Sequence, residues 1–97
     1  MDSQFLEFVK HDLAKISSNV DKDKFLAKYV FLKDEKKGLN SEKNFVSKIH
    51  GLTMELNYFY KDLSKAFSIR GDRNYFHLVI KDESGQVKCE VNHRYDD

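Results

Sequence analysis

The sequence feature that most constrains the fold is the spacing of apolar residues between positions 41 and 69. They recur at steps of three or four residues, which places them along one side of an α-helix. We therefore expect one long amphipathic helix from about residue 41 to residue 69, capped by Asn40 or Ser41 and ended near Gly71. Gly51 lies inside this helix, where glycine costs about 1 kcal/mol relative to alanine. The stripe consists of Phe45, Ile49, Leu52, Leu56, Phe59, Leu63 and Phe67.

The first 33 residues predict a second helix and one ambiguous segment. Residues 3–18 carry an apolar stripe at helical spacing, with Ser3 as its cap. Residues 24–33 fit a strand, because aromatic and β-branched residues dominate this short run. They also fit a helix with Phe25, Tyr29 and Leu32 on one side. Of these two interpretations we favour the strand.

The C-terminal segment predicts a β-hairpin. Strands at 75–81 and 87–95 flank the turn-forming cluster at 82–86. A turn loop with an even number of residues places Ile80 opposite Cys89 and Leu78 opposite Val91, which gives one continuous apolar face. The opposite face then carries Tyr75, His77, Val79, Glu90, Asn92 and Arg94.

These elements predict a single domain over residues 1–97, since a chain of this length cannot form two independent cores. The expected fold class is α+β, with two main helices packed on a small antiparallel sheet. The C-terminal hairpin belongs to this sheet, and residues 24–33 are expected to add a strand.

The balance of charge argues against general nucleic-acid binding. Seventeen basic and sixteen acidic residues give a net charge of +1, and only three of the basic residues are arginines. Residues 21–48 contain eight lysines and five acidic residues. In an alternative interpretation, this basic segment binds the phosphates of nucleic acid. Residues 81–97 contain five acidic and three basic residues, and this acidic balance favours docking of the hairpin end on a basic partner.

The sequence also predicts a compartment. The longest apolar run, residues 29–32, is far shorter than the roughly 20 residues of a membrane span. The acidic N-terminus lacks the layout of a secretory signal. Cys89 is the only cysteine, so no internal disulfide can form. We therefore expect a cytoplasmic protein with no membrane partner.

No arrangement of residues predicts catalysis, a cofactor or a metal. The four histidines form no His-x-x-x-His pair, and Cys89 lies on the predicted apolar face, where burial keeps a thiol unreactive. The glycines are scattered and form no phosphate-binding loop. We expect a protein that binds a partner and is not an enzyme.

Aromatic residues supply candidate anchors for a partner. Thirteen of the 97 residues are Tyr or Phe, and Tyr75 and Tyr95 lie at the open end of the predicted hairpin. Tyrosine at the margin of a core is either a core edge or an interface anchor. Together with the charged residues nearby, the predicted partner-binding set is Tyr75, Glu90, Arg94, Tyr95, Asp96 and Asp97.

The order of elements from residue 41 to residue 97 resembles the tail of YezG-like immunity proteins. The shared pattern is a long amphipathic helix, an aromatic-led strand at 74–81, a glycine turn, and a last strand ending in Tyr95-Asp96-Asp97. The sequence departs from the family at His93, where tyrosine is usual, and it lacks the tryptophan that usually opens the first hairpin strand. The resemblance implies an inhibitor that binds and neutralises a cognate bacterial toxin, a nuclease.

Two other functions remain open. The first is a small phage or plasmid regulator that contacts nucleic acid through the lysine-rich segment. The second is a homodimeric module that pairs through the exposed edge of the hairpin, since edge strands invite pairing. The oligomeric expectation is therefore a monomer or a homodimer.

Overall fold

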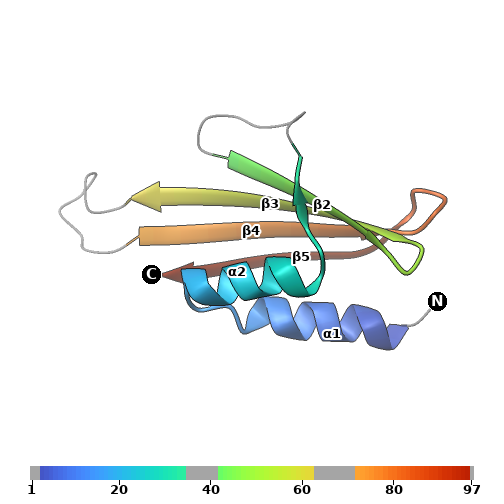
Figure 1. Ribbon diagram of the computed structural model, residues 1–97, viewed down its shortest axis with the longest axis horizontal. Helices are drawn as coiled ribbons and strands as arrows, with labels where there is room; N and C mark the ends of the chain where they lie inside the picture. The colour runs from blue at the N-terminus through green and yellow to red at the C-terminus, as the bar shows by residue number, and fades with distance from the viewer. Residues whose placement is uncertain (1–2, 35–41, 63–71, 97) are drawn as a thin grey trace.

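The computed structural model describes residues 3–34, 42–62 and 72–96 and has the expected α+β class. Two helices precede an antiparallel sheet of five strands, whose spatial order follows the chain order (Figure 1). Within the described residues, no helix combines the length and the apolar character needed to cross a membrane. The elements are α1 (Ser3–Ala14), α2 (Asn19–Lys28), β1 (Leu32–Lys33), β2 (Glu42–Ile49), β3 (Leu52–Asp62), β4 (Asp72–Lys81) and β5 (Val87–Asp96).

The predicted long helix at 41–69 is wrong. Its described part forms β2 and β3, which pair along their length with Ile49 opposite Leu52, while residues 63–71 lie outside the described residues. His50 and Gly51 connect the two strands, with φ values of 54° and 72°. Two successive residues with positive φ are typical of the tight turns that join twisted antiparallel strands. Gly51 therefore marks a hairpin turn, and the predicted close approach inside a helix does not arise.

The favoured strand at 24–33 is also wrong over most of its length. The first helix ends at Ala14, and Ser18 caps a second helix, α2, by accepting a hydrogen bond from the backbone N–H of Asp21 at 3.1 Å. Phe25 and Tyr29 are both buried on the inner side of this segment. The backbone turns at Val30, whose φ is 56°, and then forms the two-residue strand β1 beside β2. The second main helix is thus α2.

The C-terminal hairpin and its apolar pairing are confirmed, but the expected turn loop with an even number of residues is wrong, because five residues (82–86) lie between the last pair, Lys81 and Val87. Ile80 lies opposite Cys89 and Leu78 opposite Val91. An irregularity after Ile80 shifts the last pair, so that Lys81 faces Val87. The long strands β4 and β5 extend this ladder to the pairing of Arg73 with Asp96.

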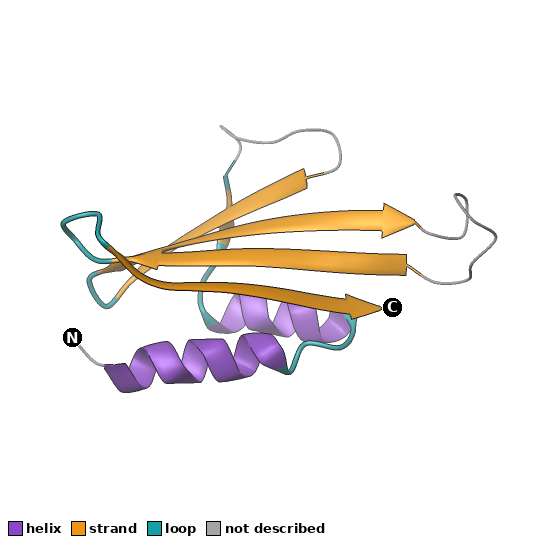
Figure 2. Cartoon of the chain, turned by 180° about the vertical axis from the view of Figure 1, so that it is seen from behind, coloured by secondary structure: helices purple, strands orange, loops and turns teal. Residues whose placement is uncertain are grey.

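The hydrophobic core lies between the helices and one face of the sheet, which we call the covered face. Both helices lie on the same side of the sheet (Figures 1 and 2). They contribute Val9, Leu13 and Ile16 from α1 and its end, with Phe25 and Tyr29 from α2. The covered face contributes Leu52, Met54, Leu56, Tyr58, Phe76, Leu78, Ile80 and Tyr95.

Polar contacts fix the helices over this core. Asp12 of α1 accepts hydrogen bonds from Lys28 and from the Tyr29 hydroxyl. Partial burial raises the pKa of Asp12, but these hydrogen bonds outweigh it and hold the pKa below its usual value. At the other end, the His93 ring lies 2.7 Å from the Ile16 carbonyl oxygen. These contacts therefore hold α1 against α2 and its C-terminal end, and they connect the segment after α1 to β5.

Candidate partner-binding face

Among the described residues, no helix packs on the opposite side of the sheet, which we call the open face (Figure 2). Side chains alternate between the two faces along each strand, so the register assigns every second residue of β2 to β5 to this side. Its members on β3, β4 and β5 are Thr53, Glu55, Asn57, Phe59, Arg73, Tyr75, His77, Val79, Lys81, Glu90, Asn92, Arg94 and Asp96.

An aromatic pair occupies the middle of the open face. Phe59 on β3 lies directly opposite Tyr75 on β4, with ring centroids 6.3 Å apart and ring planes at 59°. The Phe59 side chain is 40% exposed, although it sits on a central strand. Exposed aromatic rings that pack against each other are common anchors of binding surfaces.

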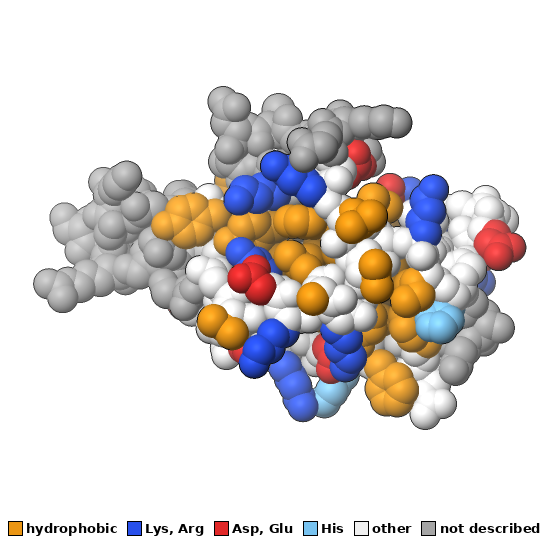
Figure 3. Space-filling view, viewed as in Figure 1, with side chains coloured by type: hydrophobic (Ala, Val, Ile, Leu, Met, Phe, Trp, Pro, Cys, Tyr) orange, Lys and Arg blue, Asp and Glu red, His pale blue; other side chains and the backbone are white. Residues whose placement is uncertain are grey.

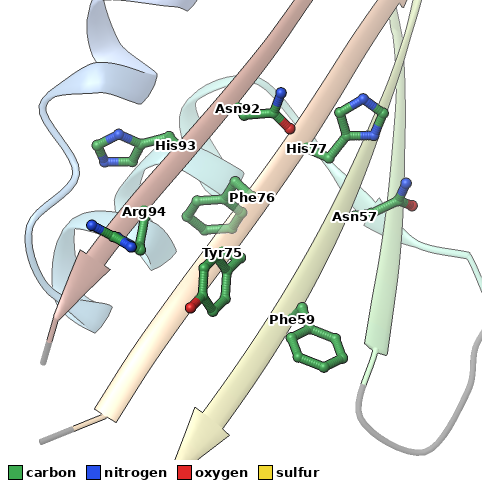
Figure 4. A pocket seen from close by; sticks show the side chains of 8 residues that line it. All are labelled: Asn57, Phe59, Tyr75, Phe76, His77, Asn92, His93 and Arg94. Carbon is green, nitrogen blue, oxygen red and sulfur yellow. The ribbon is translucent and has the colours of Figure 1, made fainter.

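A shallow groove of about 500 Å³ runs across the sheet beside this pair. Figure 4 shows the rings of Phe59 and Tyr75, two asparagine amides, the His77 imidazole and a guanidinium in one neighbourhood, contributed by β3, β4 and β5, while the His93 imidazole lies on the helix side of β5. The groove offers aromatic surface and hydrogen-bonding groups of several kinds. The residues around it are Asn57, Phe59, Tyr75, Phe76, His77, Asn92, His93 and Arg94, of which Phe76 and His93 direct their side chains to the covered face.

Three cross-strand pairs of opposite charge surround the groove. His77 Nε2 lies 2.6 Å from Glu90 Oε2, and Lys81 Nζ lies 2.9 Å from Glu55 Oε1. Arg73 Nε lies 3.5 Å from Asp96 Oδ1. Exposed pairs of this kind contribute little to stability, in the range of about 0–1 kcal/mol each. Their effect here is to leave the face nearly balanced in charge around its aromatic centre.

The structure divides the predicted partner-binding residues. Tyr75, Glu90, Arg94 and Asp96 share the open face, as the predicted register requires. Tyr95 lies on the covered face, where it is only 5% exposed. Its hydroxyl donates a hydrogen bond to Asn19 Oδ1 at 2.8 Å, and its ring stacks on Phe76. Tyr95 is thus a core residue, and the prediction of a surface anchor at this position is wrong.

The predicted acidic end of the hairpin does not form one patch. Asp82 and Glu83 lie at the β4–β5 turn, whereas Asp96 lies at the opposite end of β5. Ten strand residues separate these ends, a span of roughly 30 Å. Hydrogen bonds from the Ser84 hydroxyl and from the backbone of Ser84 and Gln86 lower the pKa of Asp82 and use its carboxylate to build the turn. Asp97 lies outside the described residues.

The lysine-rich segment at 21–48 is spread over several elements. Lys22 lies over the Tyr58 ring, 4.6 Å from its centroid, and Lys28 pairs with Asp12. Lys43 and Lys48 belong to β2, while Lys36 and Lys37 lie outside the described residues. The described lysines therefore belong to α2, β1 and β2, and Lys22 and Lys28 are among those that contact neighbouring side chains.

Groups that could support metal or thiol chemistry are not gathered in the described part of the chain. No cluster of three or more His, Cys, Asp or Glu side chains is arranged to hold a metal ion there. Cys89 is half-buried at the edge of the core, and this desolvation raises the pKa of its thiol.

Apolar side chains also reach the surface away from the groove. Figure 3 shows several of them on the side from which Figure 1 is viewed, next to Lys and Arg side chains. The most exposed are Phe8, Val20, Val30, Leu32, Tyr60 and Val87. Phe59 differs from these because its ring pairs with a second aromatic ring beside the groove.

Phe59 and Asn57 were missed as site residues because the predicted helix assigned Phe59 to a buried stripe. The signal that reveals them is the alternation of apolar and polar residues from Leu52 to Tyr58.

Comparison with protein-family models, with curated protein sequences and with solved structures finds no match for this chain.

Proposed function

We propose that this chain is a binding module that neutralises a bacterial toxin by protein–protein interaction, and that the open face is its working surface. The observation that carries the proposal is the exposed Phe59–Tyr75 pair beside a groove, on a sheet face that neither α1 nor α2 covers. The module acts by covering part of the toxin and does not perform chemistry itself.

The composition of the groove supports a protein partner. Tyr, Arg and Asn side chains are typical of interface centres, where an aromatic anchor supplies contact area and polar groups fix the orientation. The balanced charges around the groove favour a partner surface that carries both signs. This revises the partner expected from the sequence, which was mainly basic.

The resemblance to YezG-like immunity proteins contributes the toxin, a nuclease, as the class of partner. Of the pattern that carries it, the hairpin over β4 and β5 is present, whereas β2 and β3 stand in place of the long helix. The toxin assignment therefore rests on the hairpin pattern together with the exposed open face.

The test measures binding of the purified chain to the protein encoded by the gene adjacent to its own, by calorimetry, and protection of cells in which that protein is toxic. Tyr75→Ala is expected to weaken binding by about 10- to 100-fold, the usual effect of removing an aromatic anchor. Phe59→Ala is expected to act in the same direction.

Tyr60→Ala is the matched control, because Tyr60 follows Phe59 directly, is 42% exposed, and points to the other side of the sheet. It is expected to leave the affinity unchanged. Equal losses for Tyr60→Ala and Tyr75→Ala would reject the open face as the site. Absence of both binding and protection would reject the toxin inhibitor.

A second candidate function is binding of single-stranded nucleic acid, and the same aromatic pair favours it. Bases stack on aromatic rings exposed by a sheet, and arginine and asparagine side chains reach base edges. A labelled oligonucleotide and a salt titration separate the two functions. Binding at low salt that falls steeply with salt, and that Tyr75→Ala weakens, would support nucleic acid.

A further inference from the structure

We infer that β5 pairs with β5 of a second copy of this chain, antiparallel and centred on Asn92, so that two sheets join into one. The inference concerns the edge of the sheet and is independent of the proposed function of the open face. β5 is the last strand in the sheet order, so it pairs with β4 on one side only. Its ten residues form a long edge, and such edges pair with other strands when nothing prevents it.

The charges of β5 are self-complementary about Asn92. Along the open face the regular part of this strand reads Glu90, Asn92, Arg94 and Asp96. When two copies run antiparallel with the Asn92 residues opposite each other, Glu90 of each copy faces Arg94 of the other. Two pairs of opposite charge therefore flank the symmetry axis, and opposite charges in directly facing positions stabilise strand pairs.

Other registers of the same two strands lose this match. Along an edge strand, the backbone N–H and C=O groups of every second residue point outward. These residues must lie opposite the corresponding residues of the second copy, so the register can change only in steps of two residues. One step in one direction places Glu90 against Asp96, and one step in the other places Glu90 against Asn92, so that the opposite charges no longer face each other. Two steps place either Glu90 against Glu90 or Arg94 against Arg94. Like charges in facing positions are unfavourable, so the pattern selects the register centred on Asn92.

The side chains concerned are accessible. The side chain of Glu90 is 58% exposed, and Arg94 is exposed as well. The contact of Glu90 with His77 within the chain is an exposed ion pair, which exchanges partners at little cost. On the covered side, the half-buried Cys89 and Val91 add apolar contact to the seam, whereas Tyr95 is buried within its own chain.

This geometry predicts a weak dimer. One pair of strands buries less surface than a standard interface, so the dissociation constant is expected on the order of 10–100 µM. Sedimentation velocity over a concentration series of the full chain measures it. A chain that stays monomeric at millimolar concentration would overturn the inference.

Charge reversal tests the register. Glu90→Lys places lysine opposite Arg94, and Arg94→Glu places glutamate opposite Glu90, in each case twice per dimer. Each variant is expected to weaken dimerisation by about tenfold or more. The double variant Glu90→Lys/Arg94→Glu restores opposite charges and is expected to restore the dimer. Glu83→Lys, in the exposed β4–β5 turn, is the matched control for a change of net charge. A dimer that is insensitive to both single variants, or a double variant weaker than each single one, would overturn the inference.

Crosslinking gives a second readout that does not depend on charge. Residues facing each other across strands have Cβ atoms about 4.5–5.5 Å apart, which is close enough for a disulfide after a small adjustment. With Cys89→Ser as background, Asn92→Cys is expected to form a disulfide-linked dimer under mild oxidation. Glu90→Cys in the same background faces Arg94 and is expected to crosslink much less. Faster crosslinking at position 90 than at position 92 would reject the register centred on Asn92.

Discussion

The two faces of the sheet are made by alternate residues of the same strands, yet they have opposite surroundings. On β4, Phe76, Leu78 and Ile80 are at most 2% exposed beneath the helices. Their neighbours Tyr75, His77 and Val79 are half-buried on the open face. The covered face therefore carries the stability of the fold, while the open face presents an aromatic pair and paired charges at the surface.

This division teaches that stability and binding are separable in this chain. A substitution on the covered face removes contacts that hold the helices on the sheet. A substitution on the open face removes side-chain groups that already touch solvent, so it alters the surface with little effect on the core.

The largest effect is expected for Leu78→Ala compared with Val79→Ala. Leu78 is fully buried on the covered face, and removal of its branched end leaves a cavity beneath α1 and α2. The free energy of unfolding should fall by about 2–5 kcal/mol. Val79→Ala, one residue along and on the open face, should cost less than about 1.5 kcal/mol, because a half-buried valine loses less contact. Urea denaturation measures both, and equal losses would contradict the assignment of the faces.

A smaller effect is expected for Asn74→Ala, which tests the polar part of the covered face. Asn74 is fully buried and accepts a hydrogen bond from the Tyr58 hydroxyl at 2.5 Å, while its amide donates to the Tyr95 carbonyl oxygen at 3.4 Å. Alanine leaves these buried groups without their partner, at a cost of about 1–3 kcal/mol. The Asn74→Ala/Tyr58→Phe double variant should be more stable than additivity predicts, because it removes the orphaned hydroxyl as well. Additive losses would show that the two side chains do not interact.

The sequence predicted the C-terminal hairpin correctly because only one periodicity fits it. Leu78 and Ile80 on one strand, with Cys89 and Val91 on the other, alternate with polar residues at a period of two, and Gly85 lies in the turn between them. The same reasoning assigned Tyr75, Glu90 and Arg94 to one face. It placed Tyr95 in the partner-binding set although the alternation assigns this residue to the covered face.

Residues 41–62 were predicted wrongly because their apolar residues fit two periods at once. The steps from Phe45 to Ile49 and from Leu52 to Leu56 are both four residues, an even number that suits a strand as well as a helix. The residues that distinguish the two structures are Met54 and Tyr58, which complete a strand face and lie outside the helical stripe. Packing against the helices and pairing with β4 decide for the sheet, and neither is visible in local sequence.

The smallest of the three effects is expected for Gly51→Ala, and its sign is the informative part. The separation of the faces depends on the register of β2 with β3, which the His50–Gly51 turn sets, and a slip of one residue would exchange the two faces. In a helix at this position alanine would stabilise the chain by about 1 kcal/mol. In the turn, Gly51 has a φ of 72°, and an added Cβ atom would lie 3.0 Å from Glu83 Oε1. Alanine is therefore expected to destabilise the chain by roughly 1 kcal/mol, because a left-handed conformation costs an L-residue about 1–2 kcal/mol while a less flexible unfolded chain offsets part of that cost.

Gly85→Ala is the matched control. Gly85 also has a positive φ, of 88°, but no atom lies within 4 Å of an added Cβ. This variant therefore tests the backbone conformation without the close contact. Thermal unfolding of both variants gives the answer, and a rise in stability for Gly51→Ala would refute the β2–β3 turn and with it the assignment of Phe59 to the open face.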